Sequence, residues 1–77
     1  MGYYHNVTFA SISLAKKALP VIQQIDNEAD FAYEVPSYEG DGEMEIDFSS
    51  ELLLTAEQTK IIQSLRPLRV NLDNPDV

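Results

Sequence analysis

The chain has 77 residues, with 13 Asp and Glu against five Lys and Arg, one His and no Cys, and a formal net charge of −8. This charge excludes ordinary nucleic-acid binding, in which Lys and Arg neutralise phosphates, and it disfavours anionic membrane surfaces. The absence of cysteine excludes disulfides, thiolate metal sites and thiol catalysis. The length predicts a single domain over residues 1–72, followed by a flexible tail over residues 73–77.

The first part of the chain is expected to form a strand and then a helix. Over residues 3–10, Val7 and Phe9 alternate with polar residues, a pattern typical of a half-buried strand. Over residues 14–25 the apolar side chains fall on one helical stripe, which predicts an amphipathic helix. Pro20 lacks a backbone N–H, so we expect a kink or a split near Leu19.

A hairpin is predicted next. Apolar and polar residues alternate over residues 31–36, and Pro36 indicates that this second strand lies at a sheet edge. Two glycines in residues 39–42 favour a tight turn. Over residues 43–54 the even positions are mainly apolar and the first odd positions are acidic, so a long third strand with one acidic face is expected.

The end of the chain is predicted to form a helix and a last strand. Thr55 and Gln58 match a capping box, Pro67 ends the helix, and residues 68–72 alternate as a strand. The order β-α-β-β-α-β predicts an α+β domain with a ferredoxin-like antiparallel sheet and two helices on one face. RNA-recognition modules share this order but carry aromatic and basic residues on the open face, where the third strand of this chain is expected to put Glu43, Glu45 and Asp47.

The acidic residues are concentrated in one part of the sequence. Residues 26–51 hold ten of the 13 Asp and Glu and contain no Lys or Arg. Alternate carboxylates on a strand are about 6.8 Å apart and repel by roughly 0.6 kcal/mol in water. The row formed by Glu43, Glu45 and Asp47 is therefore unfavourable for a small domain. Its spacing is comparable with that of successive phosphates, which indicates a decoy for a basic groove.

We therefore predict a non-enzymatic inhibitor that binds a basic nucleic-acid-binding protein or a nuclease complex, with carboxylates in place of phosphates. Small acidic inhibitors of restriction or CRISPR enzymes, which phages commonly encode, are similar in this physical sense. The candidate contacts are Glu34, Tyr38, Glu39, Asp41, Glu43, Glu45, Asp47 and Glu51. Tyr4 is a further aromatic candidate. We expect no cofactor, no direct contact with nucleic acid or membrane, and a monomer or homodimer.

Other interpretations of the same residues remain open. The acidic face can serve solubility alone, in a structural or adaptor module that docks through its sheet edge or helices. Carboxylates at the hairpin, Glu39, Asp41 and Glu43, can attract a divalent cation. Arg69 on the open face would pair with a carboxylate and weaken the decoy. An enzyme ranks last, because His5 has no partner motif and is expected to be a surface or strand-end histidine.

The N-terminal residues lack the basic segment and apolar stretch of a signal peptide, so we expect a cytoplasmic protein.

Overall fold

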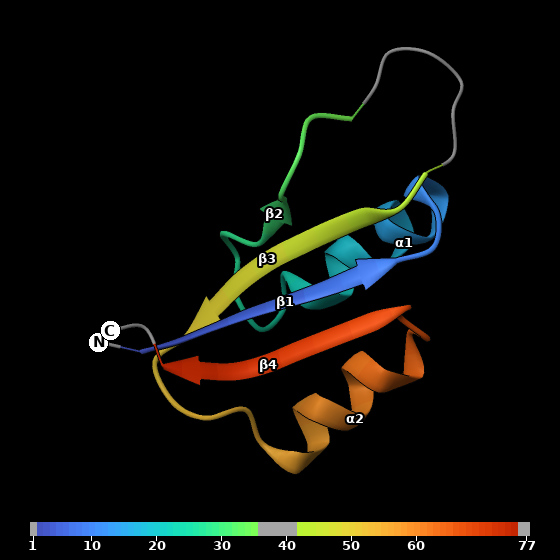
Figure 1. Ribbon diagram of the computed structural model, residues 1–77. Helices are drawn as coiled ribbons and strands as arrows, with labels where there is room; N and C mark the ends of the chain where they lie inside the picture. Colours follow the sequence, from blue (N-terminus) through green and yellow to red (C-terminus); the bar gives the residue numbers. More distant parts are fainter. Residues whose placement is uncertain (1, 36–41, 76–77) are drawn as a thin grey trace.

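The computed structural model describes residues 2–35 and 42–75. Its elements are β1 (Tyr3–Phe9), α1 (Ile12–Ile22), β2 (Asp30–Phe31), β3 (Met44–Ser50), α2 (Ala56–Ser64) and β4 (Arg69–Pro75). The strands in the described residues form one antiparallel sheet in the order β2-β3-β1-β4 (Figure 1). Each helix connects two strands that are separated by a third, which is the ferredoxin-like arrangement. The predicted fold class is therefore confirmed.

The core lies between the central strands and α1. Alternate residues of β1 and β3 are buried, as the sequence pattern predicted, and α1 adds the apolar stripe that faces them. The buried apolar residues of these three elements are Val7, Phe9, Ile12, Ala15, Ala18, Ile22, Met44, Ile46 and Phe48. Within α2, Ile62 is buried, and Leu54 is buried just before that helix. In Figure 1, α1 lies behind β1 and β3, whereas α2 lies beside β4.

The second strand is much shorter than the predicted stretch over residues 31–36. β2 consists of Asp30 and Phe31, and Ala32 adds one further backbone bond, from its N–H to the carbonyl of Glu45. Beyond β2, Tyr33 and Val35 are exposed, so these alternating apolar side chains do not contribute to the core. The predicted turn lies largely outside the described residues, as does Pro36.

The third strand ends at Ser50, not at Leu54 as predicted. The Ser50 hydroxyl donates to the carbonyl of Leu52 at 2.6 Å, which closes a turn directly after the strand. Leu52 and Leu53 are both exposed, so the apolar run after Ser50 continues neither the strand nor the core. This turn starts the connection to α2.

The last strand is longer than predicted, and the tail assigned to residues 73–77 is wrong for its first three residues. β4 extends to Pro75, which lies opposite Tyr3. The register shifts between Tyr4 and Asn6, and Asp73 has a φ of 60°, which together form a β-bulge. The bulge lets the strand continue where the strict alternation of apolar residues stops. Residues 76–77 lie outside the described part.

Both helices begin at side-chain caps. The Ser11 hydroxyl accepts a bond from the N–H of Leu14, so α1 starts before the predicted residue 14. The helix passes through Pro20 without splitting, because the N–H of Gln23 still donates to the carbonyl of Leu19 at 2.9 Å. Proline costs only one backbone bond so close to the helix end. At α2, Thr55 and Gln58 form the predicted capping box.

Candidate functional site

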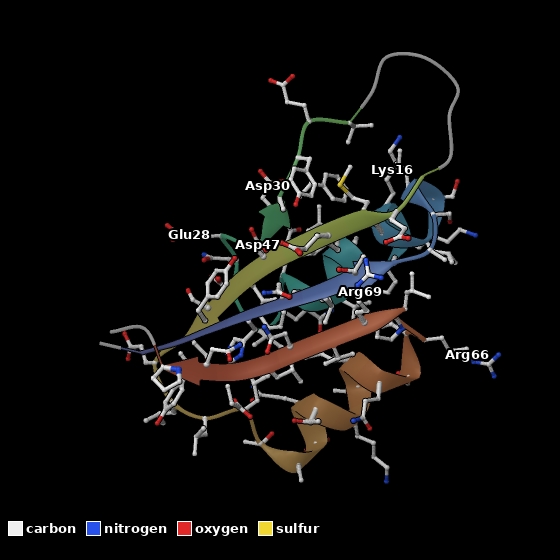
Figure 2. The ribbon with its side chains drawn as sticks, in the orientation of Figure 1. Lys16, Glu28, Asp30, Asp47, Arg66 and Arg69 are labelled. Carbon is white, nitrogen blue, oxygen red and sulfur yellow. The ribbon has the colours of Figure 1, made fainter. Side chains whose placement is uncertain are left out.

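The antiparallel register arranges side chains in rows across the open face of the sheet. Asp30 of β2 lies opposite Asp47 of β3, and Asp47 lies opposite Asn6 of β1. Residues that pair directly share a face, and the adjacent residues Val7 and Ile46 point into the core. Asp30 and Asp47 are therefore neighbours on the face opposite α1 (Figure 2).

Glu45 is the next outward residue of β3 and interacts with Asp47. The pKa of Glu45 is raised, first by hydrogen bonding with the Asp47 carboxyl and then by burial and by the Asp47 charge. The positive charge of Arg69 opposes this shift. Glu45 thus retains its proton to a higher pH than an isolated glutamate, because two full negative charges at this spacing repel each other.

Glu43 does not extend the row as a free carboxylate. It lies just before β3 and forms an ion pair with Arg69 of β4. Both side chains are more than half exposed, so the pair contributes about 0–1 kcal/mol. The pair nevertheless neutralises one member of the predicted row and places a positive charge beside it. This side of the open face is consequently less acidic than the sequence pattern predicted.

Asp47 has a hydrogen-bonding capacity that the described residues do not fill. Its Oδ1 atom is buried, and no group in the described ranges donates to it. Leaving a buried acceptor unsatisfied costs about 1–3 kcal/mol, more for a charged group. Tyr4 lies close by, and its hydroxyl pKa is raised, first by burial and then by hydrogen bonding with Asp47. This buried acceptor adds to the cost of placing Asp47 beside Glu45.

A shallow depression of about 210 Å³ opens beside Asp47. It is lined by Tyr4, Asp26, Glu28, Asp47, Phe48 and Ser49. The Asp26 carboxylate is fully engaged, since it accepts from the backbone N–H of Glu28 at 3.0 Å and of Ser49 at 2.8 Å. Asp26 thereby fastens the turn before β2 to the end of β3 and positions Glu28 at the rim. We call Glu28, Asp30, Glu45 and Asp47 the acidic surface.

The acidic surface overlaps only partly with the candidates taken from the sequence. Glu45 and Asp47 belong to it, whereas Glu34 and Glu51 are exposed residues beyond the ends of β2 and β3. Tyr38, Glu39 and Asp41 lie outside the described residues.

Sequence reasoning missed Glu28 and Asp30. Asp30 is identified by its pairing with Asp47, and Glu28 by its position at the rim of the same depression. The available signal was the run of acidic residues directly before Phe31. To place these acidic residues beside Asp47, one must know the register of β2 against β3. Alternation within one strand does not give that register.

His5 is not the surface or strand-end residue expected from the sequence. Its side chain is fully buried and its ring contacts Phe48, with the ring centroids 4.8 Å apart. The alternation of β1 explains this position, because His5 shares the inward face with Val7. Its Nε2 atom lies 2.7 Å from the Ser50 hydroxyl. The sequence did not predict this contact, because the two residues are 45 positions apart.

The Ser50–His5 pair resembles a nucleophile and its base, but its proton arrangement is reversed. The backbone N–H of Asp73 donates to His5 Nδ1 at 2.8 Å, so Nδ1 is the acceptor and Nε2 carries the proton of the neutral ring. Nε2 therefore donates to Ser50, whose own hydroxyl proton goes to the Leu52 carbonyl. A general base must instead accept the serine proton at that nitrogen. The geometry assigns His5 a structural role.

The described residues contain no cluster of three or more side chains suited to hold a metal ion. Two carboxylates of the cation interpretation, Glu39 and Asp41, lie outside them. Neither helix in the described ranges is long and apolar enough to cross a membrane.

Comparison with protein-family models, curated proteins and solved structures finds no significant match to this chain.

Proposed function

We propose that this chain is a non-enzymatic inhibitor that binds a basic nucleic-acid-binding protein or nuclease complex through its acidic surface. The observation that carries the proposal is the cluster of Asp30, Glu45 and Asp47 on one face of the sheet, where Asp30 lies opposite Asp47 and the pKa of Glu45 is raised by its contact with Asp47. An arginine from a partner neutralises these carboxylates. Guanidinium groups bind carboxylates and phosphates in the same bidentate manner, so a groove built for phosphates accepts this surface.

The distribution of charge supports this orientation of binding. In Figure 2, Glu28, Asp30 and Asp47 gather on one side of the molecule, and Lys16 and Arg66 lie toward the other. A chain with a net charge of −8 and such a separation presents its acidic side to a positively charged groove during diffusional encounter. In place of the predicted row of three carboxylates, the acidic surface combines residues of β2 and β3 with Glu28 from the turn before β2.

We place this activity in the cytoplasm, where the reducing environment suits a chain without cysteine. The chain acts there as a monomer or homodimer.

The test compares two substitutions that remove the same charge from different places. Asp30→Asn changes the acidic surface and keeps the acceptor that binds the N–H of Phe31. Glu57→Gln changes an exposed residue of α2, beside the opposite edge of the sheet. Proteins retained by the immobilised chain from an extract of its source cells are purified, and their dissociation constants are measured for each variant.

We expect Asp30→Asn to weaken binding about fivefold to tenfold, as loss of one partly screened charge contact does, and Glu57→Gln to change it less than about twofold. Raising the ionic strength should weaken the wild-type complex further. Equal effects of the two substitutions, or retained proteins that bind no nucleic acid, contradict the proposal.

A second candidate is the structural or adaptor module. Three apolar side chains of the α2 and β4 region are exposed: Ile61 at 41%, Leu68 at 50% and Val70 at 42%. In this alternative they form the docking surface, and the acidic surface serves solubility. Leu68→Gln should then abolish partner binding, and Asp30→Asn should leave it unchanged. The inhibitor proposal predicts the reverse for this pair of variants.

A further inference from the structure

Buried His5 connects three segments that are distant in the sequence. Its Nδ1 accepts from the backbone N–H of Asp73 in the bulge of β4, and its Nε2 donates to Ser50 at the end of β3. The Ser50 hydroxyl in turn donates to the Leu52 carbonyl in the connection to α2. A further bond, from the N–H of Leu54 to the Asp73 carboxylate at 3.0 Å, joins this connection to β4 directly.

This arrangement requires a neutral ring. A protonated imidazole carries a hydrogen on each nitrogen, so Nδ1 would then present a donor to the donor of Asp73. The Asp73 N–H would lose its acceptor, and the bulge would lose the contact that holds it against β1. Nε2 would still donate to Ser50, so the loss falls on the Asp73 side of the ring.

The groups around the ring act in opposite directions. Burial disfavours the imidazolium and lowers the pKa of His5 below its ordinary value of 6.5. The carboxylates of Asp73, from β4, and Asp26, from the turn before β2, favour the charged ring and oppose this shift. Phe48 and Ser50, the contacts from β3, are neutral. The neutral form therefore predominates near pH 7, and the ring gains its second proton only below pH 6.5.

The region attached through His5 has fewer buried side chains than the central strands in the described residues. Leu52 and Leu53 are exposed, Leu54 and Ile62 are buried, and Leu65 and Leu72 are only partly buried against the core. By contrast, β1 and β3 pair along their full lengths and pack against α1. Loss of the His5–Asp73 bond therefore weakens the contact of α2 and its connection with the sheet before it affects the central strands.

We infer that His5 is a pH-sensitive latch, whose protonation releases the bulge of β4 and the connection to α2 while β1, β3 and α1 remain folded. The sign follows from linkage: a folded-state pKa below the unfolded value gives stability that is present above about pH 6.5 and is lost as the pH falls through the folded-state pKa. The latch does not depend on the proposed inhibitor function.

The test is amide hydrogen exchange followed by NMR from about pH 7.5 to about pH 5, corrected for intrinsic exchange rates. Protection of the Leu54 and Asp73 amides should fall by up to about tenfold for each pH unit between about pH 6.5 and the folded-state pKa of His5, and then level off, and the amides of Val7 and Ile46 should keep theirs. Unchanged protection at Leu54 and Asp73, or a parallel loss at all four amides, overturns the inference.

Asp73→Asn provides a second test with a conservative change. Asparagine keeps the acceptor for the Leu54 N–H and tolerates the positive φ, but it removes a negative charge that favours the imidazolium. The loss of protection should extend to lower pH in this variant, because the folded-state pKa of His5 is lower there. His5→Gln, which cannot titrate, should abolish the pH dependence if it folds. A loss of protection that levels off at the same pH in Asp73→Asn as in the wild type contradicts the latch.

Discussion

At the residue scale, Glu45 and Asp47 are the clearest case of a local arrangement that disfavours folding. Their carboxyl groups interact on an exposed sheet face, and Asp30 adds a further negative charge across the β2–β3 pair. Like charges in direct cross-strand positions destabilise a sheet by up to about 1 kcal/mol. A domain of this size has only a few kcal/mol of stability, so the arrangement is costly unless a partner uses it.

Replacing Glu45 by glutamine should stabilise the chain. The folded-state pKa of Glu45 is raised, so its favourable contribution is complete below the unfolded value and is lost as the pH rises through the folded-state pKa. Above that pKa the Glu45 and Asp47 carboxylates repel each other, and Glu45→Gln removes this repulsion. We expect a gain of a few tenths to about 1 kcal/mol at pH 7 in urea denaturation, and little gain near pH 4.

Glu43→Gln is the matched control for that substitution. It removes the same charge two residues earlier but breaks the ion pair with Arg69. We expect its free energy of unfolding to be unchanged or slightly lower, because an exposed pair is worth about 0–1 kcal/mol. Stabilisation by Glu43→Gln that matches that of Glu45→Gln would show that net charge, and not the local pair, controls stability.

The same residues show that alternation within a strand predicts the direction of its side chains but not their contacts with other strands. Alternation along β3 predicted that Glu45 and Asp47 point outward and that Ile46 points inward. The structure confirms these directions. It does not reveal that Arg69 meets Glu43 or that Asp30 meets Asp47, because those contacts depend on the register between strands far apart in sequence.

At the element scale, local signals predicted helix starts better than strand ends. The capping box at Thr55 depends on neighbouring residues and appears as expected. The end of β3 depends instead on Ser50, which is held between His5 and the Leu52 carbonyl, and this contact joins residues 45 positions apart. β2 is short because Tyr33 and Val35 do not pack against the core. The pattern of residues along the chain does not show this, because it depends on the tertiary packing.

Removing the cap of α2 should destabilise the chain measurably. The Thr55 hydroxyl accepts from the N–H of Gln58 at 3.1 Å, and the Gln58 side chain accepts from the N–H of Thr55 at 2.9 Å. Thr55→Ala should lower the free energy of unfolding by about 1 kcal/mol in chemical denaturation. Thr55→Ser retains the acceptor and should stay close to wild type. Equal losses in the two variants would show that the hydroxyl cap is not responsible.

At the scale of the whole molecule, the order of elements and the uneven charge determine how the fold presents its surfaces. The connections put β3 and β1 at the centre, with short β2 at one edge and β4 at the other. The acidic surface therefore lies toward the β2 edge, and the exposed apolar residues of the α2 and β4 region lie toward the other. The sequence predicted the order of the elements along the chain and the ferredoxin-like fold, because each strand and helix has its own pattern of apolar residues.

The central claim is that the acidic surface occupies a partner's nucleic-acid site. Its most direct test is a competition experiment, in which increasing amounts of the partner's own DNA or RNA substrate are added to a preformed complex at fixed ionic strength. We expect the nucleic acid to displace the chain, with no species containing all three components. A stable ternary complex, with the chain and the nucleic acid bound to the partner together, would contradict it.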